Sequence, residues 1–298
     1  MSTSAIQGPF APAVSSPDTQ PAPITPIPNP PAVDPSKLAL GESLFNDGRL
    51  SHDGSLSCAS CHDVHTNGAA SRRVTSRHAS EMRFTVLSVF NAALSFRLNW
   101  EGNFRTLEAQ IESSLESPRN MASNTAEVLD KLKDDPVVVQ HFREAYGHPP
   151  DRSSFLDALA TYERSLLTPD SRFDRFLRGD DKALTQQERH GYELFQSLGC
   201  ISCHQGVNIG GNLFERHGIF HPLASPKPAI LRVPSLRNIA ALAPYFHDGS
   251  SPNLEDAVRK MAAAQLDQTL PAEDVTSIVA FLQTLTGNFR GVPVTAPP

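Results

Sequence analysis

The sequence predicts a mainly helical protein made of two similar domains, with little β-structure. Its 298 residues suit about two domains of roughly 150 residues each. A segment that contains a Leu-Phe pair occurs twice, as LGESLFNDGRLSHDGSLSCASCH at 40–62 and as HGYELFQSLGCISCH at 190–204. A stretch whose apolar residues follow helical spacing comes after each copy, which predicts a closing amphipathic helix in each domain.

The composition argues against two classes of protein. Asp and Glu number 32 against 26 Lys and Arg, which gives a net charge of -6 and a pI of about 6.0. Binding to nucleic acid needs clustered positive charge, so we expect no nucleic-acid partner. No apolar run reaches the roughly 18 residues that a membrane-spanning helix requires, so we expect no membrane span.

Both ends of the chain are rich in proline. Ten of the 25 prolines lie in residues 1–35, and proline fixes φ and lacks an N–H donor. We therefore expect 1–35 to be a disordered, polyproline-like tail, which is either a tether or the remainder after a leader was removed. As it stands it has neither the basic nor the apolar region of a secretory signal. Residues 291–298 (GVPVTAPP) are expected to form a second short tail.

All four cysteines lie in two CxxCH motifs, CASCH at 58–62 and CISCH at 200–204. A redox-active CxxC pair and half of a zinc site are the competing interpretations. Two copies that use every cysteine instead indicate two covalently bound haem c groups, with the thiols on the porphyrin vinyl groups and the His on the iron. The attachment residues are then Cys58, Cys61, His62, Cys200, Cys203 and His204. Covalent attachment implies a periplasmic protein, although this chain shows no leader.

Local patterns predict the helices around these motifs. The helix before the second motif has a capping box of Thr185 and Glu188 and a stop at Gly199. The closing helices are predicted from Phe155, Leu159, Tyr162 and Leu166 in the first domain and from Val275, Ile278, Val279, Leu282 and Leu285 in the second. This predicts a mainly α fold of two cytochrome c-like haem domains packed against each other. The porphyrin then forms much of each core, which explains why only 39% of the residues are apolar.

Three boundaries follow from these elements. The N-terminal haem domain is expected at 36–167 and the C-terminal haem domain at 186–290. The polar segment TPDSRFDRFLRGDDKALT at 168–185 is expected to be the linker between them.

From residue 36 to about 288 the chain resembles the bacterial dihaem cytochrome c peroxidase family, which includes the MauG-like enzymes. The matching segments are LGESLFNDGRLS, CASCH, NWEGNFRTLEAQ, ALATYERSLLTPDSRFDRFLRGDDKALT, LFQSLGCISCH, RVPSLRNIAALAPYFHDGS and LEDAVRKMAAAQL. The resemblance implies a peroxidatic, low-potential haem in the N-terminal domain and an electron-accepting, high-potential haem in the C-terminal domain. It also implies a homodimer that receives electrons from a small cytochrome c or cupredoxin.

The resemblance further implies a sixth ligand for each iron. In the family the Met ligand of the C-terminal haem lies fourteen residues past the His of YFHDG, which here leads from His247 to Met261. MauG has Tyr at this position, and the alternative role for Met261 is to fill the core of a helix. The displaceable His of the N-terminal haem lies sixteen residues past the proximal His62, at His78. His65 is too close to His62 to reach the opposite face of the ring.

Two further features are implied by the resemblance. The family calcium site lies between the haems, where it uses backbone carbonyls near Leu242 and Pro244 and an Asn side chain that has no counterpart near Arg83. Trp100, the only tryptophan, matches a residue between the haems and is a bridge for electron transfer, a core aromatic, or both.

The distal side of the peroxidatic haem departs from the family pattern. The family has a Glu twenty residues beyond the Trp for proton transfer, and this chain has Asn120. Gln110 matches the distal glutamine of the family, and its amide hydrogen-bonds peroxide but is no general base. Glu116 is the nearby carboxylate that would substitute if the loop were rearranged.

Three interpretations stay open. The first is an enzyme that reduces hydrogen peroxide to water with electrons passed from the His/Met haem, by way of Trp100, to the N-terminal haem. The second is a MauG-like oxidase that acts on a protein or organic substrate through high-valent haem. The third is a dihaem electron-transfer cytochrome without catalysis.

Overall fold

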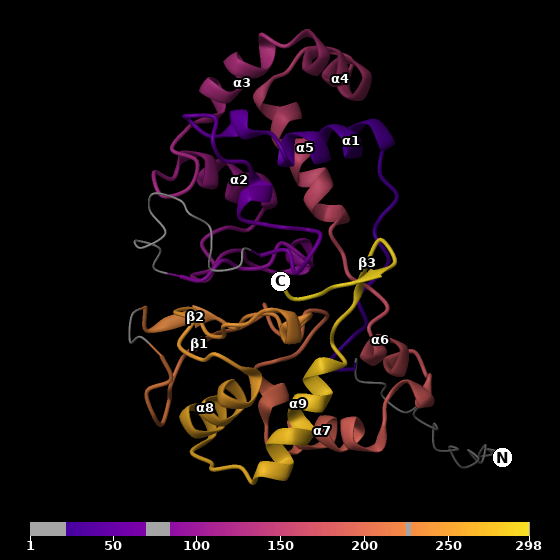
Figure 1. Cartoon of the computed structure of the whole chain (residues 1–298), viewed down its shortest axis with the longest axis vertical. Coiled ribbons are helices and arrows are strands. Elements are labelled where there is room, and N and C mark those ends of the chain that lie inside the picture. Colours follow the sequence, from indigo (N-terminus) through magenta and orange to yellow (C-terminus); the bar gives the residue numbers. More distant parts are fainter. Residues whose placement is uncertain (1–21, 70–83, 225–227, 298) are drawn as a thin grey trace, which may run out of the picture.

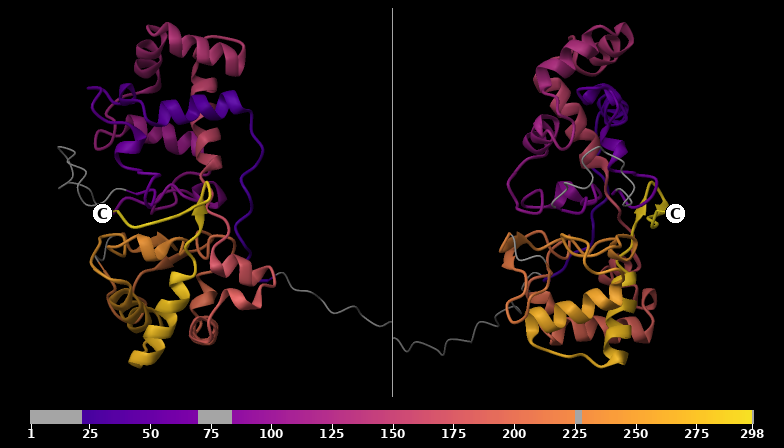
Figure 2. Two further views of the ribbon diagram at one scale, coloured as in Figure 1. Left: turned by 45° about the vertical axis from the view of Figure 1, so that its right-hand side comes forward. Right: turned by 60° about the vertical axis from the view of Figure 1, so that its left-hand side comes forward.

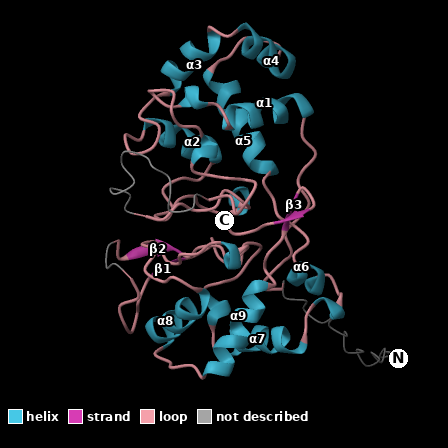
Figure 3. Ribbon diagram, viewed as in Figure 1, coloured by secondary structure: helices cyan, strands magenta, loops and turns pink. Residues whose placement is uncertain are grey.

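The computed structural model describes residues 22–69, 84–224 and 228–297, which form two helical domains stacked along the long axis (Figure 1). The N-terminal domain contains α1 (Pro35–Phe45), α2 (Leu107–Glu116), α3 (Thr125–Lys133), α4 (Pro136–Tyr146) and α5 (Arg152–Ser165). The C-terminal domain contains α6 (Arg172–Leu177), α7 (Gln186–Ser197), α8 (Leu254–Leu266) and α9 (Ala272–Gln283). The described strands form two antiparallel pairs, β1 (Phe214–Arg216) with β2 (Ile230–Arg232) and β3 (Asn288–Phe289) with β4 (Val292–Pro293) (Figure 3). The prediction of a mainly helical protein with two domains and little β-structure is confirmed.

Each domain is built on a crossing of its first and last long helix, α1 with α5 and α7 with α9. The helices cross at a glycine, because a Cβ on Gly41 would collide with the carbonyl oxygen of Ala158, and a Cβ on Gly191 with that of Ser277. An aromatic pair seals each crossing: Phe45 with Tyr162 at 5.1 Å between ring centroids, and Phe195 with Phe281 at 5.2 Å. The repeat in the sequence is therefore a repeat of one packing unit.

The capping box of α7 is confirmed. Thr185 N donates to Glu188 Oε2 at 2.7 Å, and Glu188 N donates to Thr185 Oγ1 at 3.3 Å. After α7 the chain turns at Gly199, whose φ of 90° lies in the left-handed region that favours glycine. This turn delivers the second CxxCH motif directly to the domain core.

The segment expected to be a polar linker, 168–185, is packed structure instead. It contains α6, whose Phe173 is fully buried against Tyr192 and Phe281 at 4.9 and 5.0 Å between ring centroids. Asp174 is also buried, and its carboxylate accepts a hydrogen bond from Arg237 Nη1 at 2.8 Å. The high polar content misled the expectation, because Arg172 and Asp174 pair with Glu188 and Arg237 of the C-terminal domain while other polar residues of the segment face the solvent.

The boundaries expected for the two tails differ from the structure as well. Ile24 and Ile27 are 2% and 1% exposed, and the backbone of residues 22–34 lies along the C-terminal domain before it crosses to α1 (Figure 2). At the other end, Phe289 stacks on Phe90 at 5.1 Å and Val294 is buried in the core cluster of the N-terminal domain. Each end of the described chain therefore packs on the domain at the opposite end of the sequence.

Thr168 joins the two domains. Its Oγ1 accepts hydrogen bonds from Asn91 Nδ2 at 2.7 Å and from Asn238 Nδ2 at 3.0 Å. Both asparagines have a φ of 60° and begin matching short helices, η4 (Ala92–Leu94) and η7 (Ile239–Ala241). All three side chains are buried, so the joint is shielded from water.

The described part of the chain contains no helix that is both long and apolar enough to cross a membrane.

The buried ion pair between Arg237 and Asp174 gives a stability prediction. Arg237→Met leaves the Asp174 carboxylate buried without its cation, so we expect a loss of about 3–5 kcal/mol in the free energy of unfolding. Arg290→Met, which breaks the exposed pair with Glu42, is the control and should cost about 1 kcal/mol or less. Urea unfolding of the haem-loaded protein measures both, and equal losses would contradict the assignment.

Candidate haem sites

The first attachment motif forms a single short helical turn, η2 (Cys58–Ser60). His62 N donates to Cys58 O at 3.0 Å, which fixes the His directly behind the two thiols. His62 Nδ1 lies 3.2 Å from Gly68 O, and burial lowers the pKa of His62. A neutral imidazole that donates from Nδ1 to a carbonyl keeps Nε2 as a free lone pair for a metal.

The second motif repeats this arrangement in η6 (Cys200–Ser202). His204 N donates to Cys200 O at 3.0 Å, and His204 Nδ1 lies 3.3 Å from Ile209 O. Burial lowers the pKa of His204 to about 4, so this imidazole is also neutral at pH 7. The two sites therefore present the same donor set in the same geometry.

The thiols do not suit the competing interpretations. Burial raises the pKa of Cys200 to about 11 and that of Cys58 well above its usual range, whereas a reactive redox cysteine has a lowered pKa. Within the described ranges, no group of three or more His, Cys, Asp or Glu side chains converges as a metal site. The zinc and redox interpretations consequently have no support in the described residues.

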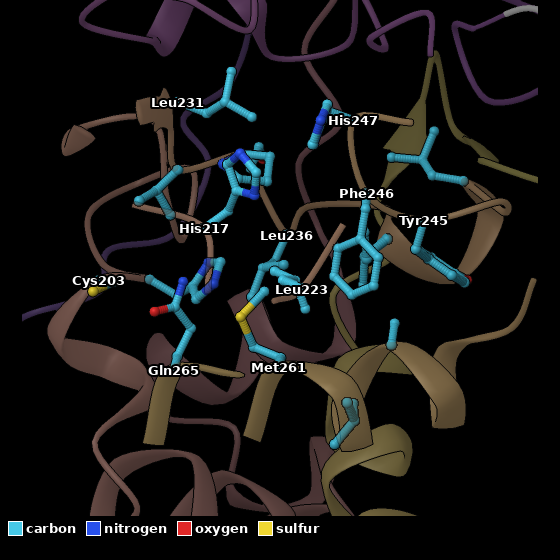
Figure 4. A pocket seen from close by; sticks show the side chains of 18 of the residues that line it. Cys203, His217, Leu223, Leu231, Leu236, Tyr245, Phe246, His247, Met261 and Gln265 are labelled. Atoms are coloured by element: carbon cyan, nitrogen blue, oxygen red, sulfur yellow. The ribbon is translucent and has the colours of Figure 1, made fainter. Parts of the chain in front are cut away.

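A cavity of about 840 Å³ lies beside the second motif, and it fits a haem group. Cys200, Cys203 and His204 line it, and Met261 of α8 points into it among largely apolar walls (Figure 4). Arg232 also lines it, is 6% exposed, and has a buried Nη1 without a hydrogen-bond partner among the described residues. Burial lowers the pKa of Arg232 to about 10, so this cation is stabilised by any carboxylate that enters the cavity. A porphyrin with two propionates supplies an apolar body for these walls and a carboxylate for the buried Arg232.

Trp100 belongs to the N-terminal domain but lines this same cavity. Its Nε1 donates to Thr85 O at 2.9 Å, and its ring lies 6.3 Å from that of His247. Arg232 N donates to the backbone carbonyl of Trp100 at 2.9 Å, so the indole is held by its own domain and the backbone of Trp100 by the C-terminal domain. The structure thus places Trp100 at the interface between the two domains.

The distal residues expected around the first site are only partly brought together. Gln110 Nε2 and Asn120 Nδ2 both donate to Ser114 Oγ, through long hydrogen bonds of 3.4 and 3.3 Å. At about 100° per residue, Glu116 lies roughly 200° from Ser114 around α2. Arg152 pairs with Glu112, and the charge of Glu116 makes a smaller contribution to the raised pKa of Arg152. Glu116 therefore does not join the Gln110 and Asn120 amides.

Other expected residues are placed less completely. His78 lies in 70–83, outside the described residues, and its role as a ligand stays a prediction. Leu242 and Pro244 follow η7 and line the cavity of the C-terminal domain. The neighbouring carbonyl of Ala241 already accepts a hydrogen bond from Asn67 Nδ2 at 2.7 Å, and calcium binding here also stays a prediction.

Two residues near the sites, His217 and Glu163, carry no motif that could have marked them in the sequence. His217 and His247 face each other across the cavity edge, with ring centroids 4.8 Å apart. Glu163 on α5 is 7% exposed, and the pKa of Cys58 is raised in part by its charge. Burial, with a smaller contribution from Glu108, raises the pKa of Glu163 to about 8. A single buried acid on a helix resembles any other helical Glu until the packing is known.

Two c-type haem attachment sites in two helical domains define a dihaem c-type cytochrome. The profile of the family "Di-haem cytochrome c peroxidase" matches residues 35–182, and that of "Cytochrome c" matches 189–286. The chain is 37% identical over 269 residues to cytochrome c551 peroxidase of Pseudomonas aeruginosa, covering 83% of this chain and 78% of that protein. The chain belongs to the dihaem cytochrome c peroxidase family, which also contains MauG, so the predicted family is confirmed.

Other relatives set the range of this family. Cytochrome c peroxidase Ccp of Escherichia coli is 36% identical over 292 residues, 92% of this chain, but the match spans only 63% of that longer protein. Methylamine utilization protein MauG of Methylorubrum extorquens is 32% identical over 248 residues, covering 77% of this chain and 70% of MauG. Among solved structures, a MauG-like protein associated with microbial copper homeostasis superposes with a TM-score of 0.75 at 25% identity, covering 90% of this chain and 95% of that one.

The buried acid Glu163 gives a pH prediction. Its folded pKa lies above the usual value, so its contribution to stability is fully present below about pH 4.5 and is lost as the pH rises through about 8. Its loss lowers the free energy of unfolding by at most about 5 kcal/mol. Glu163→Gln should flatten this decline, and the exposed Glu144→Gln should not. Unfolding midpoints at pH 5 and pH 8.5 test this, and an unchanged decline in Glu163→Gln would contradict it.

Proposed function

We propose that this protein is a periplasmic dihaem oxidoreductase that reduces hydrogen peroxide to water with two electrons from a small cytochrome c or cupredoxin and two protons from solvent. The observation that carries the proposal is a complete haem attachment motif in each of two packed domains, with Trp100 of the N-terminal domain lining the cavity of the C-terminal domain. Haem c, held by two thioether bonds and a histidine, supplies one-electron chemistry at its iron. The residues of this chain then decide where electrons enter, cross and leave.

Electron entry is supported at the C-terminal site. Ile219 lines the cavity and is 57% exposed, and the adjacent Phe220 is exposed to the same extent. Phe214 and Ile230 of the neighbouring strands are exposed as well. An exposed apolar surface beside a redox site suits a transient partner, because it excludes water without fixing one geometry. In this proposal Met261, which lines the same cavity as His204, would be the second protein ligand of the iron, and its thioether would raise the potential.

The crossing between the sites runs past Trp100. The rings of Phe84 and His247 lie 6.5 and 6.3 Å from the indole, so aromatic groups fill the interface beside the cavity. Because Trp100 is hydrogen-bonded to Thr85 and Arg232, it stays in place while partners bind and leave.

Peroxide is held, in this proposal, by the carboxamides of Gln110 and Asn120 on the distal side of the N-terminal site. These groups donate and accept hydrogen bonds but do not remove a proton at neutral pH. This neutral distal site favours a second function, a MauG-like oxidase that draws electrons from a protein or organic substrate. Met261 counts against close identity with MauG.

One experiment separates these functions. The haem-loaded protein is reduced by one electron, and its spectrum is recorded before and after addition of peroxide and a reduced donor cytochrome. A high-spin N-terminal haem with rapid donor oxidation is expected for the peroxidase. Peroxide consumption without donor oxidation would favour the oxidase. Low-spin spectra without turnover would indicate an electron-transfer cytochrome and contradict the proposal.

Met261 gives the first prediction for this function. Met261→His should lower the potential of the C-terminal haem by on the order of 100 mV or more, because a thioether favours ferrous iron over an imidazole. Met121→Leu, a change in the core of the N-terminal domain, is the control. Spectroelectrochemical titration measures both, and an unchanged potential in Met261→His would mean that another residue is the ligand.

Asn120 gives the second prediction. Asn120→Glu adds a carboxylate beside Gln110 and Ser114 and should raise kcat for peroxide at least about tenfold, the low end for a positioned acid–base group. Asn120→Gln is the matched control, because it has the longer side chain without the charge. Donor oxidation under steady-state conditions measures the gain. Equal kcat values for the two variants would show that position 120 does not face bound peroxide.

A further inference from the structure

The two domains are related by an internal repeat that extends well beyond the CxxCH motifs. Asn238 lies 147 positions after Asn91, and both residues have a φ of 60° and start a short helix. Isolated antiparallel bridges follow at the same interval, Leu98 with Phe104 and Tyr245 with Ser251. The polypeptide therefore follows one path twice on the way from the interface to α2 and α8.

The same interval places α2 and α8 in register. Thr106 caps α2 by accepting from Ala109 N, and Asn253, 147 positions later, caps α8 by accepting from Asp256 N. Met261 on α8 then corresponds to Ser114 on α2. On α2 the hydroxyl of Ser114 is hydrogen-bonded to the amide of Gln110. Gln110 in turn corresponds to Ala257 of α8, which lines the cavity of the C-terminal domain.

We propose that Ser114 occupies the position of a sixth iron ligand in the N-terminal domain and instead orders the two carboxamides that hold the incoming molecule. The inference rests on the proposed ligation of the C-terminal iron by Met261. A serine hydroxyl is a poor ligand for haem iron beside a thioether or an imidazole, so α2 itself supplies no ligand, and this face is open once the displaceable His78 has left. The hydroxyl accepts from Gln110 Nε2 and Asn120 Nδ2, and these bonds turn both amides toward one point.

The substitution of Ser114 by Met tests the position directly. Ser114→Met should convert the N-terminal haem to His/Met ligation. Because both haems then have a thioether ligand, the absorbance of the thioether-to-iron charge-transfer band per protein should about double. The Met261 band and the helical circular dichroism show in the same sample that the protein is folded. Ser113→Met, one residue earlier on the same helix, is the matched control and should leave the absorbance of the charge-transfer band unchanged. An unchanged absorbance of this band in folded Ser114→Met would overturn the proposal.

A second set of variants tests the ordering of the amides without changing the ligands. Ser114→Ala should weaken cyanide binding to the N-terminal haem about tenfold at equilibrium, through loss of the hydroxyl that fixes both amides. Ser114→Thr should restore it, and Ser113→Ala should not change it. Equal affinities in Ser114→Ala and Ser113→Ala would sink the positioning role.

The outcomes separate this inference from the proposed function. If Met261→Ala abolishes the thioether band while Ser114→Met adds none, the ligand of the C-terminal iron stands and only the role of Ser114 fails. If Met261→Ala leaves the band unchanged, the proposed ligation itself fails. Neither result depends on peroxide turnover.

Discussion

The rest of the structure depends on the joint at Thr168, where one buried hydroxyl accepts hydrogen bonds from an asparagine of each domain. Because both asparagines adopt the left-handed conformation that starts η4 and η7, the joint sets the direction in which each chain leaves the interface. The segment that follows Asn91 places Trp100 in the wall of the cavity of the C-terminal domain, and the segment that follows Asn238 places His247 in the wall of the same cavity. The interface is thus part of the redox site rather than a surface between two finished domains.

The sequence was sufficient where covalent chemistry or short-range geometry determines structure. The CxxCH motifs, the capping box of Thr185 and the apolar spacing of the closing helices each act within a few residues, so their positions could be predicted. Packing between distant segments could not. Ile24 is buried among residues of the C-terminal domain that lie about 150 positions or more along the chain. Asp174 is buried beside Arg237, which lies 63 positions along the chain. The polar composition of 168–185 and the prolines of 1–35 carried no trace of those partners.

The candidate site shows the same division. Alignment by family pattern predicted the positions of Gln110, Asn120 and Met261, but not the hydroxyl of Ser114 that lies between the two amides. Nor could it show that Glu116 lies away from Ser114 around α2, because both faces of the helix carry polar residues. In the proposed function, the distal side therefore holds two amides next to an interface rich in aromatic rings. Such a site is arranged for electron transfer more completely than for proton transfer.

The exchange of chain ends has a consequence for how this architecture can be divided. The first residues of the described chain cover the C-terminal domain, and the last ones cover the N-terminal domain. Neither haem domain corresponds to a continuous stretch of sequence. If the chain were divided between the two domains, each fragment would lack a terminal segment that is carried by the other fragment. Complete packing of either domain therefore requires a segment from the far end of the chain, so the stabilities of the two haem domains are coupled.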